Sequence, residues 1–143
     1  MDIVSPYLWA IAAGWVVAQG AKYVIVVIRT RDLSDLRQLY VSGNMPSAHS
    51  ATAIALLTVI ALKDGLNSGL FGLAALFAAI IMYDAVMVRR SVGEQGEAVQ
   101  QLIKEQKSKV KLPRAARGHT PLEVIVGTFV GIIVGSVVFF ATV

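Results

Sequence analysis

Long apolar runs separated by polar segments dominate this chain. Residues 6–28, 70–88 and 121–142 are each about as long as the roughly 20 apolar residues that span a bilayer as a helix, and a shorter run covers residues 47–62. The pattern predicts an all-α fold. We expect a single membrane domain, residues 1–143, built as a bundle of four transmembrane helices.

Two polar segments, residues 29–46 and 89–120, connect these runs on one side of the predicted bundle. Short interfacial helices are expected within them, one beginning near Asp32 and one over residues 94–106. Nearly all lysines and arginines fall in these two segments. Because cytoplasmic loops are enriched in Lys and Arg, this face is predicted to be cytoplasmic, with both termini outside.

Composition supports a membrane protein and excludes several classes of site. The chain has 143 residues, of which 56% are hydrophobic, and a mean hydropathy of +0.68, which is too apolar for an ordinary soluble domain. It contains no cysteine, so disulfides and thiolate metal sites are excluded. The net charge of +4 is explained by membrane orientation, and no nucleic-acid partner is expected.

Polar and charged side chains gather near the predicted cytoplasmic face. Charged residues within spans are rare and usually face the bundle interior or a cavity. We therefore expect these residues to converge on one site. The residues are Lys22, Arg29, His49, Asp84, Arg89, Arg90, His119 and Glu123.

Lys22 and Arg29 are seven residues apart, so they share a helix face with about 10 Å between them. Such a pair could hold a dianion from one wall of a cavity. Alternatively, Arg29 anchors the helix at the headgroups and Lys22 extends toward them along apolar surface.

The segment 42–50, SGNMPSAHS, places Ser47 and His49 where a polar stretch runs into an apolar helix. A helix N-terminus binds anions through its free N–H groups and the positive end of its dipole. A bound phosphate would favour the imidazolium form of His49, which makes this residue a candidate proton donor. The alternative is an ordinary capping sequence that happens to include a histidine.

His119 and Glu123 are four residues apart, which places them on adjoining turns of one helix face. A carboxylate beside an imidazole fixes its tautomer, so the other ring nitrogen is available as a nucleophile. The alternative is a first-turn glutamate that stabilises the helix dipole. An unpaired carboxylate is costly in an apolar span, which favours the pair.

Two histidines and a carboxylate could also ligate zinc or iron. The same face carries an excess of cations, however, and this suits an anion better. No metal or other cofactor is therefore expected. Asp84 is expected to support the site by pairing with Lys22, Arg89 or Arg90.

Gly127, Gly131 and Gly135 form a series of small residues at four-residue spacing, which allows another helix to approach closely. The partner helix could belong to the same chain or to a second copy, so a homo-oligomer through glycine-rich faces is left open.

Three motifs together resemble the type-2 phosphatidic acid phosphatase superfamily, which includes the vanadium-dependent haloperoxidases. They are Lys22-x6-Arg29, Pro46-Ser47-Ala48-His49 and His119-x3-Glu123. Segment 42–50, the residues YDA and VRR at 83–90 and the sequence GHTPLEV at 118–124 resemble its divergent, small bacterial and plastid branch. The resemblance covers most of the chain, from Lys22 to about Gly127.

The resemblance implies metal-independent hydrolysis of a phosphomonoester or pyrophosphate, and the position of the polar residues at the bilayer face suggests a lipid phosphate. His119 would attack phosphorus to form a phosphohistidine, Glu123 would orient it, and His49 would protonate the leaving oxygen. The phosphoryl oxygens would be bound by Lys22, Arg29, Ser47 and an arginine of the third motif. The expected location is the bacterial inner (plasma) membrane, among membrane lipids, with the site facing the cytoplasm.

The chain departs from the superfamily pattern at several positions. Thr30 and Ala48 replace a proline and a glycine, and Glu123 replaces an aspartate. The usual Ser-Arg six residues before the nucleophile is missing, so Arg89 or Arg90 would supply the arginine, with Arg114 and Arg117 as rivals.

Two other functions fit the same residues. A catalytically inactive protein could bind an anion or a lipid headgroup in this pocket. A small transporter could use Asp84 and Glu123 as a proton relay, although four short spans leave little room for alternating access.

Overall fold

The computed structural model describes residues 5–31, 45–113, 115 and 118–142, and it is helical throughout these ranges apart from turns and loops. This confirms the all-α prediction. The elements are α1 (Pro6–Thr30), α2 (Ala48–Lys63), α3 (Gly69–Tyr83), the π-helical segment η2 (Asp84–Val88), α4 (Arg89–Glu105) and α5 (Pro121–Thr142). Segment 32–44, with the predicted interfacial helix after Asp32, lies outside the described residues.

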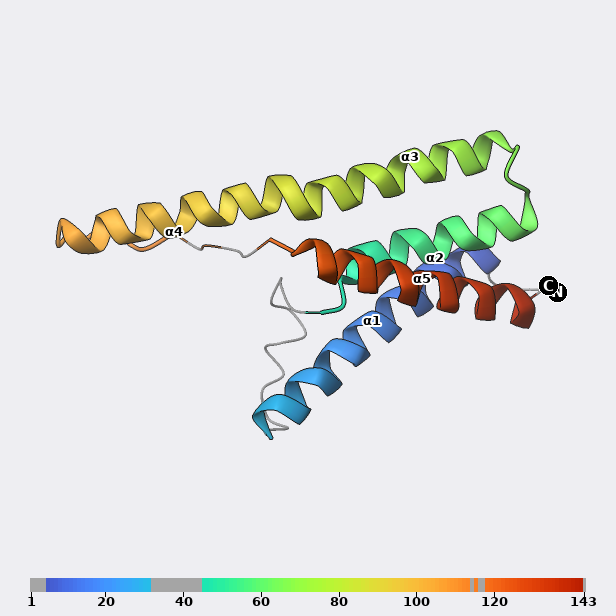
Figure 1. Cartoon of the computed structure of the whole chain (residues 1–143), viewed down its shortest axis with the longest axis horizontal. Helices are drawn as coiled ribbons and strands as arrows, with labels where there is room; N and C mark the ends of the chain where they lie inside the picture. The colour runs from blue at the N-terminus through green and yellow to red at the C-terminus, as the bar shows by residue number, and fades with distance from the viewer. Residues whose placement is uncertain (1–4, 32–44, 114, 116–117, 143) are drawn as a thin grey trace.

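The third span and the predicted surface helix form one continuous helix, Gly69–Glu105, of 37 residues (Figure 1). The sequence predicted a span ending at residue 88 and a separate helix over residues 94–106. The separation into two helices was wrong, because only the polarity changes near Arg89, while no proline interrupts the backbone before Pro113. The end of the membrane span at residue 88 stays a prediction. The α4 part of this helix extends beyond the bundle (Figure 1).

Three helices of the described chain are long and apolar enough to cross a membrane: α1, Gly69–Glu105 and α5. The fourth apolar helix, α2, has 16 residues and is about 24 Å long, shorter than the roughly 30 Å hydrocarbon core. It packs on α1, α3 and α5. The prediction of four helices was correct, but only three have the length of a full span.

Helix α2 lies at the centre of the bundle because its neighbours present small residues to it. A Cβ atom on Gly127, Gly131 or Gly135 would lie 2.6 Å from a backbone carbonyl oxygen of α2 or its N-cap. Those oxygens belong to Ser47, Ala51 and Ala55. The glycine series therefore packs within the chain and brings the first turns of α5 and α2 together.

Gly131→Ala is expected to destabilise the bundle by about 1–3 kcal/mol, because its methyl group would overlap the Ala51 carbonyl oxygen. Thermal unfolding in detergent would measure this as a lower melting temperature. Gly72→Ala is the matched control: its methyl group would meet no atom within 4 Å, so stability should stay equal or rise slightly. Equal melting temperatures for the two variants would contradict the packing described here.

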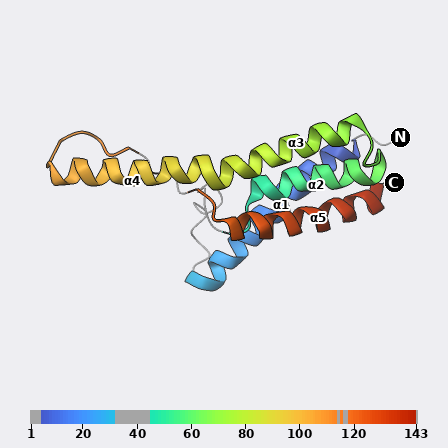
Figure 2. The same cartoon turned by 45° about the horizontal axis from the view of Figure 1, so that its top comes forward.

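The start of α1 and the end of α5 lie at one end of the bundle, and α4 projects from the other (Figure 2). At the first end, the Tyr7 hydroxyl donates a hydrogen bond of 2.7 Å to Asp64, just after α2. The sequence predicted both termini on one side of the bundle, and the start of α1 and the end of α5 do lie together. The starts of α2 and α5 face the end from which α4 projects, and the candidate site lies there.

Candidate functional site

His119 lies immediately before α5 and is 4% exposed. Its backbone N–H donates a hydrogen bond of 3.1 Å to the carbonyl oxygen of Ala85 in η2. Its Nδ1 atom lies 2.9 Å from Oε2 of Glu123. An ionised carboxylate only accepts, so Nδ1 carries the hydrogen and Nε2 of the neutral ring presents a lone pair.

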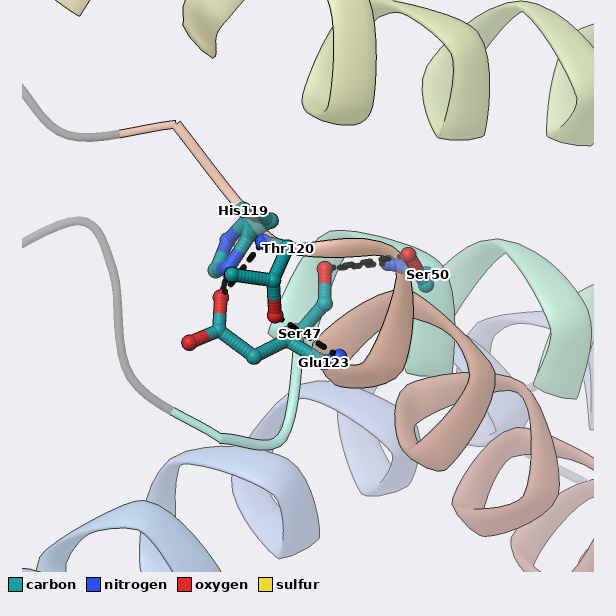
Figure 3. A network of polar contacts seen from close by, with 5 residues as sticks. All are labelled: Ser47, Ser50, His119, Thr120 and Glu123. Atoms are coloured by element: carbon teal, nitrogen blue, oxygen red, sulfur yellow. Dashed lines mark hydrogen bonds and ion pairs between the residues drawn. The ribbon is translucent and has the colours of Figure 1, made fainter.

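Glu123 holds His119 and the start of α5 with the same oxygen atom (Figure 3). Oε2 also accepts a 3.1 Å hydrogen bond from the Thr120 N–H, while the Thr120 hydroxyl accepts a 3.3 Å bond from the Glu123 N–H. This reciprocal arrangement is a capping box, which satisfies N–H groups that a helix start leaves without partners. Glutamate is a usual residue at this position of a capping box, so Glu123 serves the helix start as well as His119.

The π-helical segment supplies the backbone contact that fixes His119. A π-helix has i→i+5 hydrogen bonds and occurs frequently at functional sites; here the Arg89 N–H bonds to the Asp84 carbonyl oxygen. Gly118 approaches so closely that a Cβ atom there would overlap the backbone of Arg90. The chain entering α5 is therefore seated directly against η2 and the start of α4.

Ser47 caps α2 and is fully buried. Its hydroxyl oxygen accepts from the Ser50 N–H at 3.4 Å and from the Ser50 hydroxyl at 3.0 Å, and its own N–H donates to the Glu123 carbonyl oxygen at 3.1 Å (Figure 3). The structure therefore brings Ser47 next to Glu123, where it joins the starts of α2 and α5.

His49 is in the first turn of α2 and its side chain is exposed. The charges of Arg89 and Lys22 act on its imidazole, and so does the charge of Asp84. Ionisable groups from three separate elements, α1, η2 and α4, thus act on this histidine.

Lys22 is buried on the inner face of α1, where it is 4% exposed. The charge of Glu123 acts on its ammonium group, although the described residues include no carboxylate in ion-pair contact with it. One turn earlier, Gln19 has a buried Oε1 atom with no hydrogen-bond partner in the described part of the chain. The inner face of α1 therefore carries an unneutralised cation and an unsatisfied acceptor.

The arginines differ in how near they lie to His119. Arg90 Nε bonds to Glu94 at 3.0 Å, and Arg90 lines a cavity with His119. Arg89 Nε bonds to Asp84 at 2.6 Å, so Asp84 pairs with one of the three cations expected for it. Arg29 is exposed in the last turn of α1, and no contact in the described residues joins it to His119. Arg114 and Arg117 lie outside the described residues.

A cavity of about 330 Å³ opens beside His119. Its wall combines residues of α4 with the entrance to α5: Arg90, Gly93, Glu94, Glu97, Gly118, His119 and Thr120. The wall is partly polar, which gives a water molecule or an anion a route to His119. In the described part of the chain, no three His, Asp or Glu side chains are arranged to hold a metal ion.

Three features of the site were missed from the sequence. The capping box was readable in Thr120-Pro121-Leu122-Glu123, because Thr-x-x-Glu before an apolar run is its sequence pattern. The Arg90–Glu94 pair was also readable from its four-residue spacing. The contact of His119 with Ala85 has no sequence pattern, because it depends on how two distant segments pack.

Comparisons with known proteins identify the family of the chain. Residues 3–134 match the Divergent PAP2 family. The chain is 37% identical over 150 residues to "Uncharacterized membrane protein YuiD" of Bacillus subtilis (strain 168), and the alignment covers 94% of each protein. No solved structure matches the chain. The resemblance seen in the sequence is confirmed, and the chain belongs to the Divergent PAP2 family.

Proposed function

We propose that this protein is a membrane phosphatase that hydrolyses a lipid phosphomonoester or pyrophosphate through a phosphohistidine intermediate. The 2.9 Å contact between His119 Nδ1 and Glu123 Oε2 carries this proposal. It fixes the imidazole so that Nε2 is free to act as a nucleophile, in the way that the orienting acid serves a catalytic triad.

The reaction has two steps in this proposal. Nε2 of His119 forms a bond to phosphorus while the bond from phosphorus to the leaving oxygen breaks, and His49 gives a proton to that oxygen. A water molecule then attacks the phosphohistidine, His49 takes the proton from the water, and inorganic phosphate leaves as the P–N bond breaks. His49 thus serves as acid and then as base.

Phosphoryl transfer requires mainly positioning and stabilisation of negative charge on the phosphoryl oxygens. We assign this to Lys22 and Arg90, because Lys22 is buried without an ion pair among the described residues and Arg90 lines the cavity with His119. Arg89 contributes charge beside His49. Arg29, which is exposed in the last turn of α1, would attract the anionic headgroup toward the site. Ser47 would act by holding the α2 N-terminus in place.

We infer the orientation in the membrane from the charge distribution. Segments 29–46 and 89–120 carry most of the Lys and Arg residues. The proposal therefore places the site at the cytoplasmic side of a bacterial inner membrane, with both termini outside.

Phosphate release by the purified protein tests the proposal. Protein in detergent, with EDTA present, is expected to release phosphate from dodecyl phosphate. After a rapid quench with labelled substrate, it should also carry protein-bound phosphate with the acid lability and alkali stability of a phosphohistidine. The absence of both phosphate release and bound phosphate would exclude the phosphatase.

A second candidate is a catalytically inactive protein that binds an anion or a lipid headgroup. It is favoured because Arg89 is held by Asp84 and Arg90 by Glu94, which leaves these groups less able to stabilise the charge of a transition state. Lys22 has no ion pair among the described residues and could still bind an anion. Vanadate bound at His119, in a protein that releases no phosphate, would identify this function.

A further inference from the structure

A second cavity, of about 240 Å³, lies between α1, α2 and α3, and its wall is almost entirely apolar. We call it the α1–α2–α3 groove. Its lining includes Ile11 and Trp15 of α1, His49 and Leu56 of α2, and Phe77 and Ile81 of α3. Ligand sites are often of this kind, mostly apolar with a few polar groups that fix orientation.

Cations gather at one end of this groove. His49 is in its wall, about 10 Å along α2 from Leu56. Beyond Trp15 on α1 comes Lys22, and beyond Ile81 on the long helix comes Arg89. The charges of Lys22 and Arg89 act on His49, and so does the charge of Asp84, which pairs with Arg89 at 2.6 Å. The groove is therefore apolar along its length and meets charged groups at the candidate site, where Lys22 has no ion pair among the described residues.

The groove opens to the outer surface of the bundle. Ile11 is 37% exposed, Trp15 53% and Phe77 58%, although all three line it. They belong to α1 and to the continuous helix Gly69–Glu105, both of which are long and apolar enough to cross a bilayer. A hydrocarbon chain can therefore enter from the membrane without crossing water.

We propose that the α1–α2–α3 groove binds the hydrocarbon chain of the lipid phosphate, an inference that rests on the function proposed above. His49 lines this groove, whereas His119 lines the polar cavity beside α4. The bond that breaks lies between the two histidines. The alcohol product receives its proton from His49 and leaves along the groove, while water enters and phosphate departs through the polar cavity.

Charge and polarity together select this occupant. A free phosphate or a soluble phosphate ester would leave the apolar wall empty. A neutral lipid alcohol would fill the wall but would leave Lys22, which has no ion pair among the described residues, without a counter-charge. An anionic phosphate on a long apolar chain satisfies both.

Ile11→Trp fills the groove and tests this assignment by substrate preference. In proteoliposomes, the ratio of kcat/KM for dodecyl phosphate to that for phenyl phosphate is expected to fall about tenfold. Ile133→Trp is the matched control, because Ile133 is 64% exposed on α5 and does not line the groove. The control should keep the wild-type ratio. An unchanged ratio in Ile11→Trp, with both substrates still hydrolysed, would overturn the groove and leave the phosphatase standing.

Binding provides a readout that does not depend on turnover. The chain has two tryptophans, so Trp9→Phe leaves only Trp15, in the groove wall. An alkyl phosphate brominated along its chain should quench Trp15 fluorescence at least several-fold more than the matching brominated alcohol at equal mole fraction in vesicles. This result would support the groove even if phosphate release failed, whereas equal quenching by the two probes would overturn it.

Discussion

His119→Ala is expected to reduce phosphate release from dodecyl phosphate by at least about 10³-fold, because no other described group occupies the position of the nucleophile. The substitution keeps the backbone N–H that bonds to the Ala85 carbonyl oxygen, so the entrance to α5 retains its anchor. Phosphate release and protein-bound phosphate, measured side by side with wild type, check this prediction.

The melting temperature of His119→Ala serves as its control and should stay within a few degrees of wild type. A folded variant that kept a tenth or more of the wild-type rate would exclude His119 as the nucleophile. It would also exclude the phosphohistidine.

Glu123→Gln is expected to lower turnover on the order of 10³-fold while leaving stability nearly unchanged. Glutamine can still accept the Thr120 N–H and complete the capping box, so α5 begins as before. It lacks the negative charge that stabilises positive charge on His119 as the P–N bond forms. Initial rates on dodecyl phosphate and thermal unfolding measure the two effects separately.

Thr120→Ala is the matched control, because it is expected to change stability and leave turnover nearly unchanged. It removes the hydroxyl that accepts the Glu123 N–H and should cost about 1 kcal/mol of stability. Turnover should change little, because the contact from His119 to Glu123 stays. If Glu123→Gln retained full turnover, Glu123 would be a helix cap only.

Periodicity and spacing were sufficient to predict most of the fold. The apolar runs gave the four helices because burial in a bilayer demands long uninterrupted apolar stretches. The separation of the third span from a surface helix over residues 94–106 was wrong because polarity reports where a helix leaves an apolar environment, not where its backbone hydrogen bonds end. The backbone can continue because no proline lies between Gly69 and Glu105.

The local contacts of the candidate site could be read from the sequence, while its long-range contacts could not. The four-residue spacing of His119 and Glu123 predicted their contact, which the structure contains. The pairing of Asp84 with Arg89 was among the expected alternatives. The seating of Gly118 on the Arg90 backbone, by contrast, depends on the path of the chain between them.

The sharing of one Glu123 oxygen between a helix start and an imidazole has a consequence for comparing members of this family. A relative that has lost its enzymatic activity would still need Thr120 and Glu123 to begin the last helix. These two positions would therefore persist under selection for folding alone, and their presence is poor evidence of turnover. His119 has no such duty through its side chain, so under the proposed function its loss would mark a relative in which only the scaffold survives.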